Sequence, residues 1–460
     1  MLNQPVIAVI DVGKTNKKLF LFDEHYKIVY ERAARFIETV DEDGDTCENL
    51  ESLRLSVFDS LRDVFSKKEF HVKAINFSAY GASFVCVGED GLPVAPLYNY
   101  LKPYPEWLKQ QFYSTYGGEE EFSLKTASPV LGSLNSGMQL YRLKFQKPQI
   151  FNEVKCALHL PQYLSYLISG KLSSDITSIG CHTNLWNFQT SAYHDWVYRE
   201  GLNEKLAPVV ASDAVVPAAF PGNSYCVGVG LHDSSAALIP YLVSFSEPFV
   251  LISTGTWCIS LNPFNQQPLT VEELKQDCLC YLSYEGKPVK ASRLFAGQEH
   301  EEGVKRIADH FNRNPVHYRS IEYNPGIISK LNGRKIPGEA GSAASNIPFD
   351  QYDLQQFTSD EEAYHQLMLN IILQQRASTD LVLAGTKTKR IFVDGGFCKN
   401  SLYMNLLAAV YPDMEIFAAS MAQATAMGTA LAIHRWWNKK PLPSDIIELK
   451  YYSLTNDVVL

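Results

Sequence analysis

The chain has 460 residues, of which 46% are hydrophobic and 20% are charged, and its formal net charge is -9. This composition is typical of a globular protein, and the length suits two domains. The negative charge argues against nucleic acid or an anionic membrane as a partner, and no apolar run approaches the length of about 20 residues that spans a membrane.

Cysteine usage and the N-terminal sequence indicate a cytoplasmic protein. The nine cysteines are scattered, which predicts free thiols in a reducing compartment. Cys278 and Cys280 form a close pair, but no second pair or histidine cluster stands near them to suggest zinc. The first residues lack the basic region and cleavage site of a signal peptide.

The first predicted element is a hairpin over residues 6–22, VIAVIDVGKTNKKLFLF. Apolar, β-branched runs flank a polar turn that holds a glycine and a hydroxyl side chain. Such runs are typical of buried strands, and the amides and hydroxyls of such a turn suit phosphate oxygens. Asp11 ends the first run and is a candidate ligand for Mg²⁺. The candidates for phosphate contact are Gly13, Lys14, Thr15 and Asn16.

The next elements complete the first half of the chain. Residues 27–36 predict a strand, residues 41–49 a polar loop whose acidic side chains can cap a following helix, and residues 51–65 that helix. Residues 72–94 then predict a strand, a glycine-containing turn and a second strand. Residues 106–185 are mainly helical in pattern, with breaks at prolines.

Two motifs of this half are candidates for substrate contact. Tyr80-Gly81-Ala82-Ser83 combines an aromatic face, close backbone and a hydroxyl, which suits a sugar pocket if a cleft lies here; without a cleft, a plain turn is the better explanation. His232-Asp233 lies just before the second half begins. Asp233 is a candidate general base for a substrate hydroxyl, and capping of the next helix is a compatible alternative.

The second half begins with another hairpin over residues 249–261, FVLISTGTWCISL, whose turn offers Thr254, Gly255 and Thr256 to phosphate. A loop is predicted over residues 326–346. The elements expected after it are a helix over 361–383, a strand over 390–396, a helix over 400–411, a strand over 414–418 and a last helix from about residue 422. This β-α-β-α order predicts a parallel, helix-covered sheet.

Together these patterns predict a two-domain α/β protein with a central cleft, divided into residues 1–242 and 243–460. Two hairpins of one type in equivalent positions would hold a triphosphate from both sides. Gly395 and Gly396 end a strand and offer bare backbone to a flat group such as adenine, with Asn400 at the head of the next helix. A tight strand-to-helix turn is the alternative explanation for the two glycines.

In this order, the motifs resemble the FGGY carbohydrate kinases of the actin/hexokinase-like superfamily over residues 6–437. Residues 157–172, ALHLPQYLSYLISGKL, and 251–261, LISTGTWCISL, are most similar to the rhamnulokinases, and the fuculokinases come next. FVDGGFCKNSLYMNLLA resembles the adenosine motif of the family, and AQATAMGTALAI its C-terminal signature helix.

The resemblance implies two ribonuclease-H-like domains and ATP- and Mg²⁺-dependent phosphorylation of a ketose or related sugar. It implies Asp233 as the base, with His232 beside it in the sugar site. Asp11, Gly13, Thr15 and Asn16 would serve phosphates and Mg²⁺, and Thr254, Gly255 and Thr256 the opposing loop. Gly395, Gly396 and Asn400 would contact adenosine. A monomer or homodimer is expected.

Two departures from the family pattern concern the sugar. Relatives commonly carry an aspartate where Ser83 stands, and an aspartate-x-arginine element where this chain has residues 99–104, NYLKPY. Losing both would alter substrate choice, or would leave a sugar-sensing pseudokinase without activity. An actin-like ATPase acting on proteins is a further alternative. Lys14 replaces a small residue and either pairs with phosphate or points to solvent.

Overall fold

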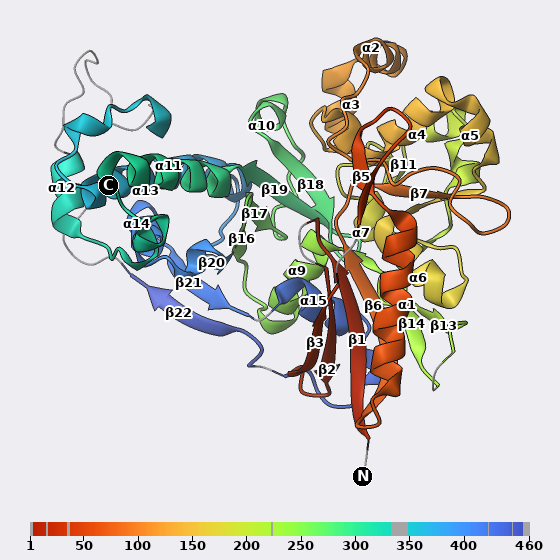
Figure 1. The fold of residues 1–460 in the computed structure, drawn as a ribbon. Helices are drawn as coiled ribbons and strands as arrows, with labels where there is room; N and C mark the ends of the chain where they lie inside the picture. The colour runs from red at the N-terminus through yellow and green to blue at the C-terminus, as the bar shows by residue number, and fades with distance from the viewer. Residues whose placement is uncertain are drawn as a thin grey trace.

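Two lobes, each built on a seven-stranded mixed sheet, make up the computed structural model of the protein (Figure 1). The structure describes residues 3–14, 17–34, 37–221, 224–332, 348–421, 423–443 and 445–453. None of the helices in these ranges is long and apolar enough to cross a membrane.

The first sheet has the strand order β13-β14-β6-β1-β2-β3, and β15 also pairs with β6. Its strands are β1 (Gln4–Val12), β2 (Lys17–Asp23), β3 (Ile28–Ala33), β6 (Phe70–Ala79), β13 (Val215–Pro217), β14 (Cys226–Gly228) and β15 (Leu231–His232). Successive residues of a strand face opposite sides of its sheet. In β1, Val6 and Ala8 therefore pack with α1, whereas Ile7 and Val9 pack with α9 and α15 on the other face. Both faces are covered, which explains why β1 reads as a continuous apolar run.

The second sheet repeats this plan in the order β18-β19-β17-β16-β20-β21-β22. Its strands are β16 (Val250–Thr254), β17 (Cys258–Asn262), β18 (Cys278–Leu282), β19 (Pro288–Leu294), β20 (Arg390–Gly395), β21 (Glu415–Ser420) and β22 (Glu448–Tyr452). In both sheets a hairpin, β1-β2 or β16-β17, is followed by a strand parallel to its first member, β6 or β20. The predicted two-domain α/β class and both predicted hairpins are confirmed.

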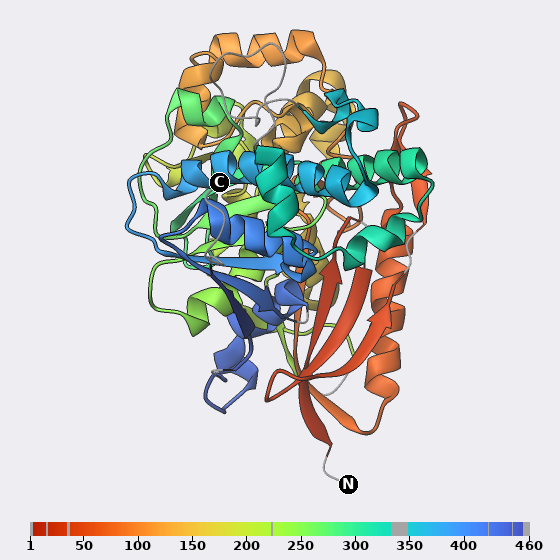
Figure 2. The same cartoon turned by 90° about the vertical axis from the view of Figure 1, so that its left-hand side faces the viewer.

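Helices cover the two sheets and build the outer part of the first lobe. The longer ones are α1 (Leu50–Ser66), α2 (Glu106–Thr115), α3 (Glu119–Thr126), α4 (Ser136–Gln146), α6 (Leu160–Ser169), α9 (Asp233–Ser244), α11 (Ala296–Phe311), α12 (Pro325–Asn332), α13 (Asp360–Leu383), α14 (Ser401–Val410) and α15 (Ala424–Ala432). The short ones are α5 (Pro148–Glu153), α7 (Ile176–Ile179), α8 (Asp195–Arg199), α10 (Val271–Lys275) and α16 (His434–Trp437). Figure 2 shows α11 and α13 lying across the second sheet.

Four two-stranded pairs complete the fold. They are β4 (Glu38–Val40) with β5 (Thr46–Glu48), β7 (Phe84–Val87) with β8 (Cys156–His159), β9 (Ser174–Asp175) with β12 (Val209–Val210), and β10 (Trp186–Asn187) with β11 (Ala192–Tyr193). The strand expected after Gly81 thus exists, but it pairs with β8 and not with β6. Residues 325–332 are helical, which corrects the predicted loop; residues 333–346 of that loop lie outside the described ranges.

The acidic loop of residues 41–49 has a role that the sequence did not predict. Asn49, and not an acidic side chain, caps α1 by accepting the amide of Ser52 at 2.9 Å. The acidic side chains instead surround the buried ammonium of Lys102, which binds Asp41 and lies 2.7 Å from Asp43 and 3.0 Å from Asp45. A buried charge needs such partners. They anchor residues 99–104 to this loop.

The lobes meet where α9 crosses α15. A Cβ added to Gly428 would lie 1.8 Å from the carbonyl oxygen of Ala236, so only glycine allows the two backbones to come this close. α15 also reaches the first sheet, where the side-chain amide of Asn76 donates to the carbonyl of Thr429 at 2.8 Å. α15, from the C-terminal half of the chain, thus packs on the first sheet. The predicted domain boundary between residues 242 and 243 stays a prediction.

Candidate functional site

Asp233 begins α9, directly after β15 has brought the chain to the end of β6. Its Oδ1 accepts the amide of Ser234 at 2.6 Å, and its side chain is 31% exposed. Burial raises the pKa of Asp233 to about 6, while hydrogen bonds from Ser234 act in the opposite direction. The carboxylate therefore remains charged at pH 7 and is basic enough to accept a proton.

His232 is buried beside Asp233, with its Nε2 3.3 Å from Asp233 Oδ1. Burial lowers the pKa of His232 to about 4, so the ring is neutral at pH 7. The ring lies against Gly81: a Cβ at residue 81 would be 2.7 Å from His232 Cδ2. The structure therefore brings Gly81, His232 and Asp233 together, although 151 residues separate Gly81 from His232 in the chain.

Asp11 is the last residue but one of β1, near Asp233. Its Oδ1 accepts the hydroxyl of Ser78 at 2.8 Å. Burial raises the pKa of Asp11 to about 7; the Ser78 hydrogen bond lowers it, and the neighbouring charge of Asp233 raises it further. Two carboxylates this close repel each other, and a divalent cation between them would relieve that repulsion. Asp11 thus fits a magnesium ligand.

Lys14 turns toward a small aromatic wall rather than into solvent. Its Nζ lies 3.6 Å from Glu48 Oε1, 5.4 Å from the ring centroid of Tyr80 and 5.5 Å from that of Tyr100. The buried carboxylate of Glu48 also faces Lys17 at 3.2 Å, yet neither of its oxygens accepts a well-formed hydrogen bond from the described residues. Thr15 and Asn16, which follow Lys14, lie outside those residues.

The neighbouring turn holds a buried hydroxyl oxygen that has no partner among the described residues. Ala82 has a φ of 63°, and its carbonyl accepts Gln139 Nε2 at 2.6 Å. Ser83 is 1% exposed, and its hydroxyl has no hydrogen-bond partner in the described part of the chain. Lys102, from the segment where relatives carry an arginine, is occupied by its three aspartates and offers no cation here.

The turn of the second hairpin abuts the end of β20. Thr254 Oγ1 donates to the carbonyl of Asp394 at 2.5 Å and accepts the amide of Phe397 at 2.9 Å. A Cβ at Gly395, whose φ is +92°, would lie 1.9 Å from the carbonyl oxygen of Thr254. Thr254 thus joins the two strand ends, and Gly255 and Thr256 remain exposed.

A cavity of about 520 Å³ opens beside this turn. Its lining is Gly255, Thr256, Gly297, His300, Glu301, Arg319, Tyr364, Gly396, Phe397, Lys399 and Asn400. Asn400 caps α14 through the amide of Tyr403 at 3.0 Å and donates to the hydroxyl of Tyr364 at 2.8 Å. Four predicted residues, Gly255, Thr256, Gly396 and Asn400, therefore share one cavity.

Family models match both halves of the chain. The N-terminal domain of the FGGY family of carbohydrate kinases matches residues 6–233, and the C-terminal domain of carbohydrate kinase FGGY matches residues 246–441. The chain belongs to the FGGY family of carbohydrate kinases. The two family models cover the resemblance predicted over residues 6–437, and the C-terminal match extends to residue 441.

Individual relatives of this FGGY chain are distant. A rhamnulokinase from Mannheimia succiniciproducens is 23% identical over 274 residues, covering 55% of this chain and 52% of the relative. An L-fuculokinase from Salmonella typhi is 22% identical over 270 residues, covering 56% of each. The chain thus spans about half the length of the curated relatives it matches.

Solved structures match over nearly the whole chain. A carbohydrate kinase from Novosphingobium aromaticivorans has a TM-score of 0.79 at 24% identity and covers 99% of this chain and 96% of its own. A ligand-bound xylulose kinase from Lactobacillus acidophilus has a TM-score of 0.78 at 18% identity, covering 98% and 94%. These likenesses confirm the two-domain fold of the family.

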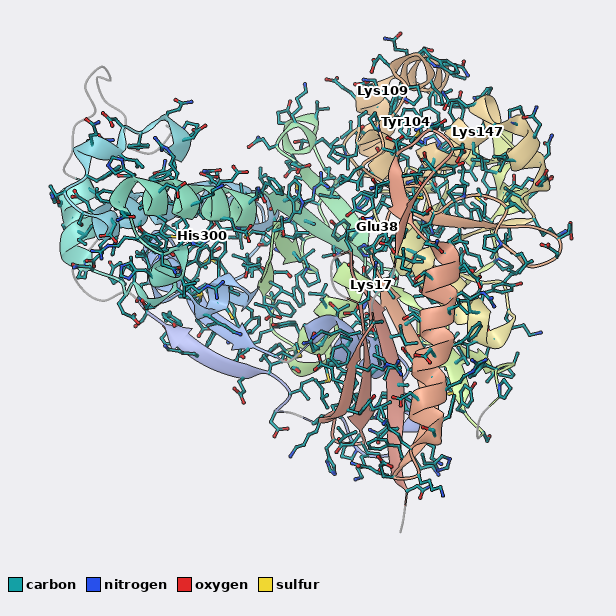
Figure 3. All side chains as sticks on the ribbon, in the orientation of Figure 1. Lys17, Glu38, Tyr104, Lys109, Lys147 and His300 are labelled. Atoms are coloured by element: carbon teal, nitrogen blue, oxygen red, sulfur yellow. The ribbon has the colours of Figure 1, made fainter. Side chains whose placement is uncertain are left out.

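Several residues that line the cavity of the FGGY chain, or the aromatic wall next to Lys14, were not predicted. His300 and Arg319 come from α11 and from the 3₁₀ turn Pro315–Ser320, and Figure 3 shows His300 in the second lobe, across from Lys17 in the first. Glu48 lies in the segment predicted as a polar loop, and Tyr100 in residues 99–104, for which the sequence predicted no element. The surplus of acidic residues before α1 was the one available signal for Glu48.

Proposed function

We propose that this FGGY protein is an ATP-dependent kinase that transfers the γ-phosphate to a hydroxyl of a ketose or related sugar, of rhamnulose or fuculose type, with Asp233 as general base. The observation that carries the proposal is the Asp233 carboxylate: it begins α9, its side chain is 31% exposed, and its charge raises the pKa of Asp11. A positioned base contributes about 10²–10⁴-fold to such a reaction.

In the proposed step, Asp233 takes the proton of the sugar hydroxyl as its oxygen forms a bond to the γ-phosphorus. The bond from that phosphorus to the bridging oxygen breaks, and ADP leaves. Mg²⁺, when bound, supplies positive charge to the phosphates, and Asp11 would hold it. Asp233 sits at the N-terminus of a twelve-residue helix, whose dipole favours its ionised form.

The nucleotide would lie in the cavity of the second lobe. Gly255 and Thr256 offer an exposed turn for phosphate oxygens, and Lys399 and Arg319 add positive charge to the lining. Gly396 leaves room for a flat base, because a Cβ there would come no nearer than 4.0 Å to the Thr254 carbonyl oxygen. These features of the lining suit ATP.

The sugar would lie against Lys14, Glu48, Tyr80 and Tyr100, with Ser83 beneath. The buried hydroxyl of Ser83 lacks a hydrogen bond from the described residues, which costs free energy unless a ligand with hydroxyl groups completes it, and the Glu48 carboxylate, held by Lys14 and Lys17, is a further acceptor. Burial raises the pKa of Tyr100 most, and the negative charge of Asp233 raises it more than that of Glu48 does. The aromatic wall therefore lies near the proposed base. We propose that Lys14 and Glu48 take over the sugar recognition that the aspartate and the aspartate-x-arginine element, absent at Ser83 and residues 99–104, would provide.

The test measures ADP release with ATP, Mg²⁺ and a panel of ketoses and polyols. We expect turnover with at least one sugar, and an Asp233→Asn variant that binds the sugar but loses kcat by about 10²–10⁴-fold. The exposed Asp309 on α11 gives a matched control, Asp309→Asn, that keeps kcat. Sugar binding without turnover in the unaltered protein would instead identify a sensor and refute the kinase proposal.

A further inference from the structure

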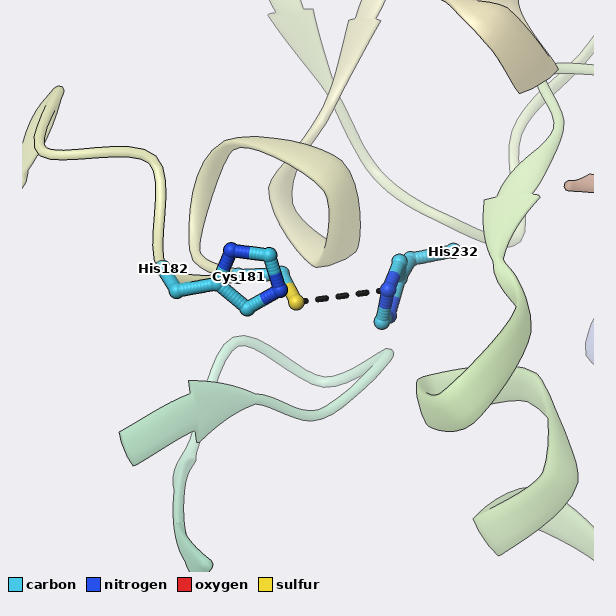
Figure 4. A group of neighbouring side chains, drawn as sticks. All are labelled: Cys181, His182 and His232. Atoms are coloured by element: carbon cyan, nitrogen blue, oxygen red, sulfur yellow. Dashed lines mark hydrogen bonds between the residues drawn. The ribbon is translucent and has the colours of Figure 1, made fainter. Parts of the chain in front are cut away.

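A thiol and two imidazoles converge next to Asp233. Cys181 and His182 lie in the turn after α7, and His232 is the last residue of β15 (Figure 4). One potential ligand atom from each side chain lies within 4.8 Å of the other two, and Cys181, His182 and His232 are 1%, 8% and 3% exposed. No other group of this kind occurs in the described ranges.

The two histidines present ring nitrogens to the shared space. His182 Nδ1 lies 3.1 Å from the carbonyl oxygen of Leu134; because a carbonyl only accepts, Nδ1 carries the proton and Nε2 keeps its lone pair. Such a backbone bond is what orients metal-binding histidines in proteins. His232 Nε2 lies 3.3 Å from Cys181 Sγ, and His232 Nδ1 is buried without a partner. In this arrangement His182 is fixed by a bond that leaves its second nitrogen available.

One sulfur and two nitrogen donors are the ligand set that Zn²⁺ accepts. Ligands at about 2.0–2.3 Å in tetrahedral geometry lie roughly 3.3–3.8 Å from one another, which the Cys181–His232 distance already meets. Asp233 Oδ1 lies 3.3 Å from His232 Nε2, beside this set of three donors but not part of it. We propose that Cys181, His182 and His232 form a Zn²⁺ site whose fourth position is left to water, next to Asp233.

The surrounding charges permit a cation. Arg293 is the nearby positive group, and its guanidinium is paired with Asp277 by bonds of 3.1 and 2.5 Å. Tyr281 faces both histidine rings, with centroids 6.0 Å from His182 and 5.9 Å from His232. On binding, the Cys181 thiol loses its proton to solvent and the sulfur bonds to the metal.

Occupation of this site has a consequence that rests on the proposed function. Zn²⁺ bound to His232 Nε2, which lies 3.3 Å from Asp233 Oδ1, would attract that carboxylate away from the proton of the sugar hydroxyl and would occupy His232 itself. Zn²⁺ and sugar should therefore exclude each other, and the protein should act as a kinase only when this site is free of zinc. Relief by a chelator would then restore full turnover.

The experiment uses Co²⁺ as a spectroscopic probe on the full-length, nucleotide-free protein. Cobalt in a tetrahedral site with a thiolate ligand gives a near-ultraviolet charge-transfer band. We expect one equivalent of Co²⁺ to produce this band and Zn²⁺ to remove it by displacement. Cys181→Ala should abolish the band and weaken Zn²⁺ binding at least about tenfold. Cys280→Ala, at another buried thiol, should retain both.

Two further measurements keep the outcome decisive. If Cys181→Ala lowers the melting temperature and confuses the comparison, His182→Gln must show the same loss of Zn²⁺ affinity, and the retained thiolate band must shift. A band that survives in Cys181→Ala, or no band at all in the unaltered protein, overturns the proposal. Because the band requires no turnover, a protein that binds cobalt but phosphorylates no sugar would refute the kinase function and leave the metal site standing.

Discussion

Gly81→Ala should impair sugar phosphorylation because the proposed sugar site places a glycine against His232. The new Cβ would lie 2.7 Å from His232 Cδ2 and 2.8 Å from Nε2. Ordinary carbon contacts begin near 3.5 Å, so the ring must withdraw by about 0.8 Å. The backbone of His232 resists such a movement, because its amide donates a hydrogen bond to Thr177 Oγ1 at 2.9 Å that would be lost. A misplacement of about 1 Å in a reacting site costs up to about 10²-fold.

We therefore expect kcat/KM for the sugar to fall by roughly 10- to 100-fold, while the KM for ATP stays unchanged because the nucleotide cavity does not include Gly81. Steady-state ADP release at varied sugar and varied ATP separates the two. Overpacking should destabilise the fold by about 1–3 kcal/mol, which thermal unfolding measures. Gly326→Ala is the control, since its Cβ meets only Asn324 Oδ1 at 3.3 Å. An unchanged kcat/KM for the sugar in a folded Gly81→Ala protein would refute the reasoning.

Two further results are expected. The pKa of Asp233, raised by burial to about 6, implies that kcat/KM for the sugar falls about tenfold between pH 7 and pH 5, because the base must be ionised; a flat profile would contradict its role. Lys102→Met should destabilise the protein by about 3–5 kcal/mol in urea unfolding, because it leaves the buried carboxylate of Asp41 without its cation. A loss below about 1 kcal/mol would show that water or rearrangement replaces the lysine, and Lys109→Met on the exposed α2 is the matched control.

Sequence patterns predicted the helices and strands that follow from the local spacing of apolar residues. The hairpins β1-β2 and β16-β17 and the helix α13 follow from runs of apolar residues and their spacing. Their repetition in two halves predicted the duplicated fold. The contact of Gly81 with His232 was reachable only through the family resemblance, because no local pattern links residues so far apart.

The arrangement of the proposed sugar site could not be predicted, because it depends on contacts between residues far apart in the chain. The direction of Lys14 is set by Glu48, which lies in a segment that the sequence identified only as an acidic loop. Residues 99–104 likewise gave no sign that Lys102 would turn inward to that loop. His300 lies on an amphipathic helix whose spacing is explained by packing alone, so nothing in the pattern marked it as a cavity residue. The roles of all these residues stay predictions.

The crossing of α9 and α15 links the proposed base to a residue far outside either pocket. Ala236, which touches Gly428, lies one helical turn after Asp233 on the same rigid rod. Any side chain at residue 428 would push that rod away from its neighbour and carry the carboxylate with it. A substitution of Gly428 would therefore move the Asp233 carboxylate, which lies about one helical turn from the crossing. The packing of α15 on α9 thus helps to fix the position of the proposed base. In an engineered or evolving relative, position 428 is a place where activity can be lost without any alteration to a ligand contact.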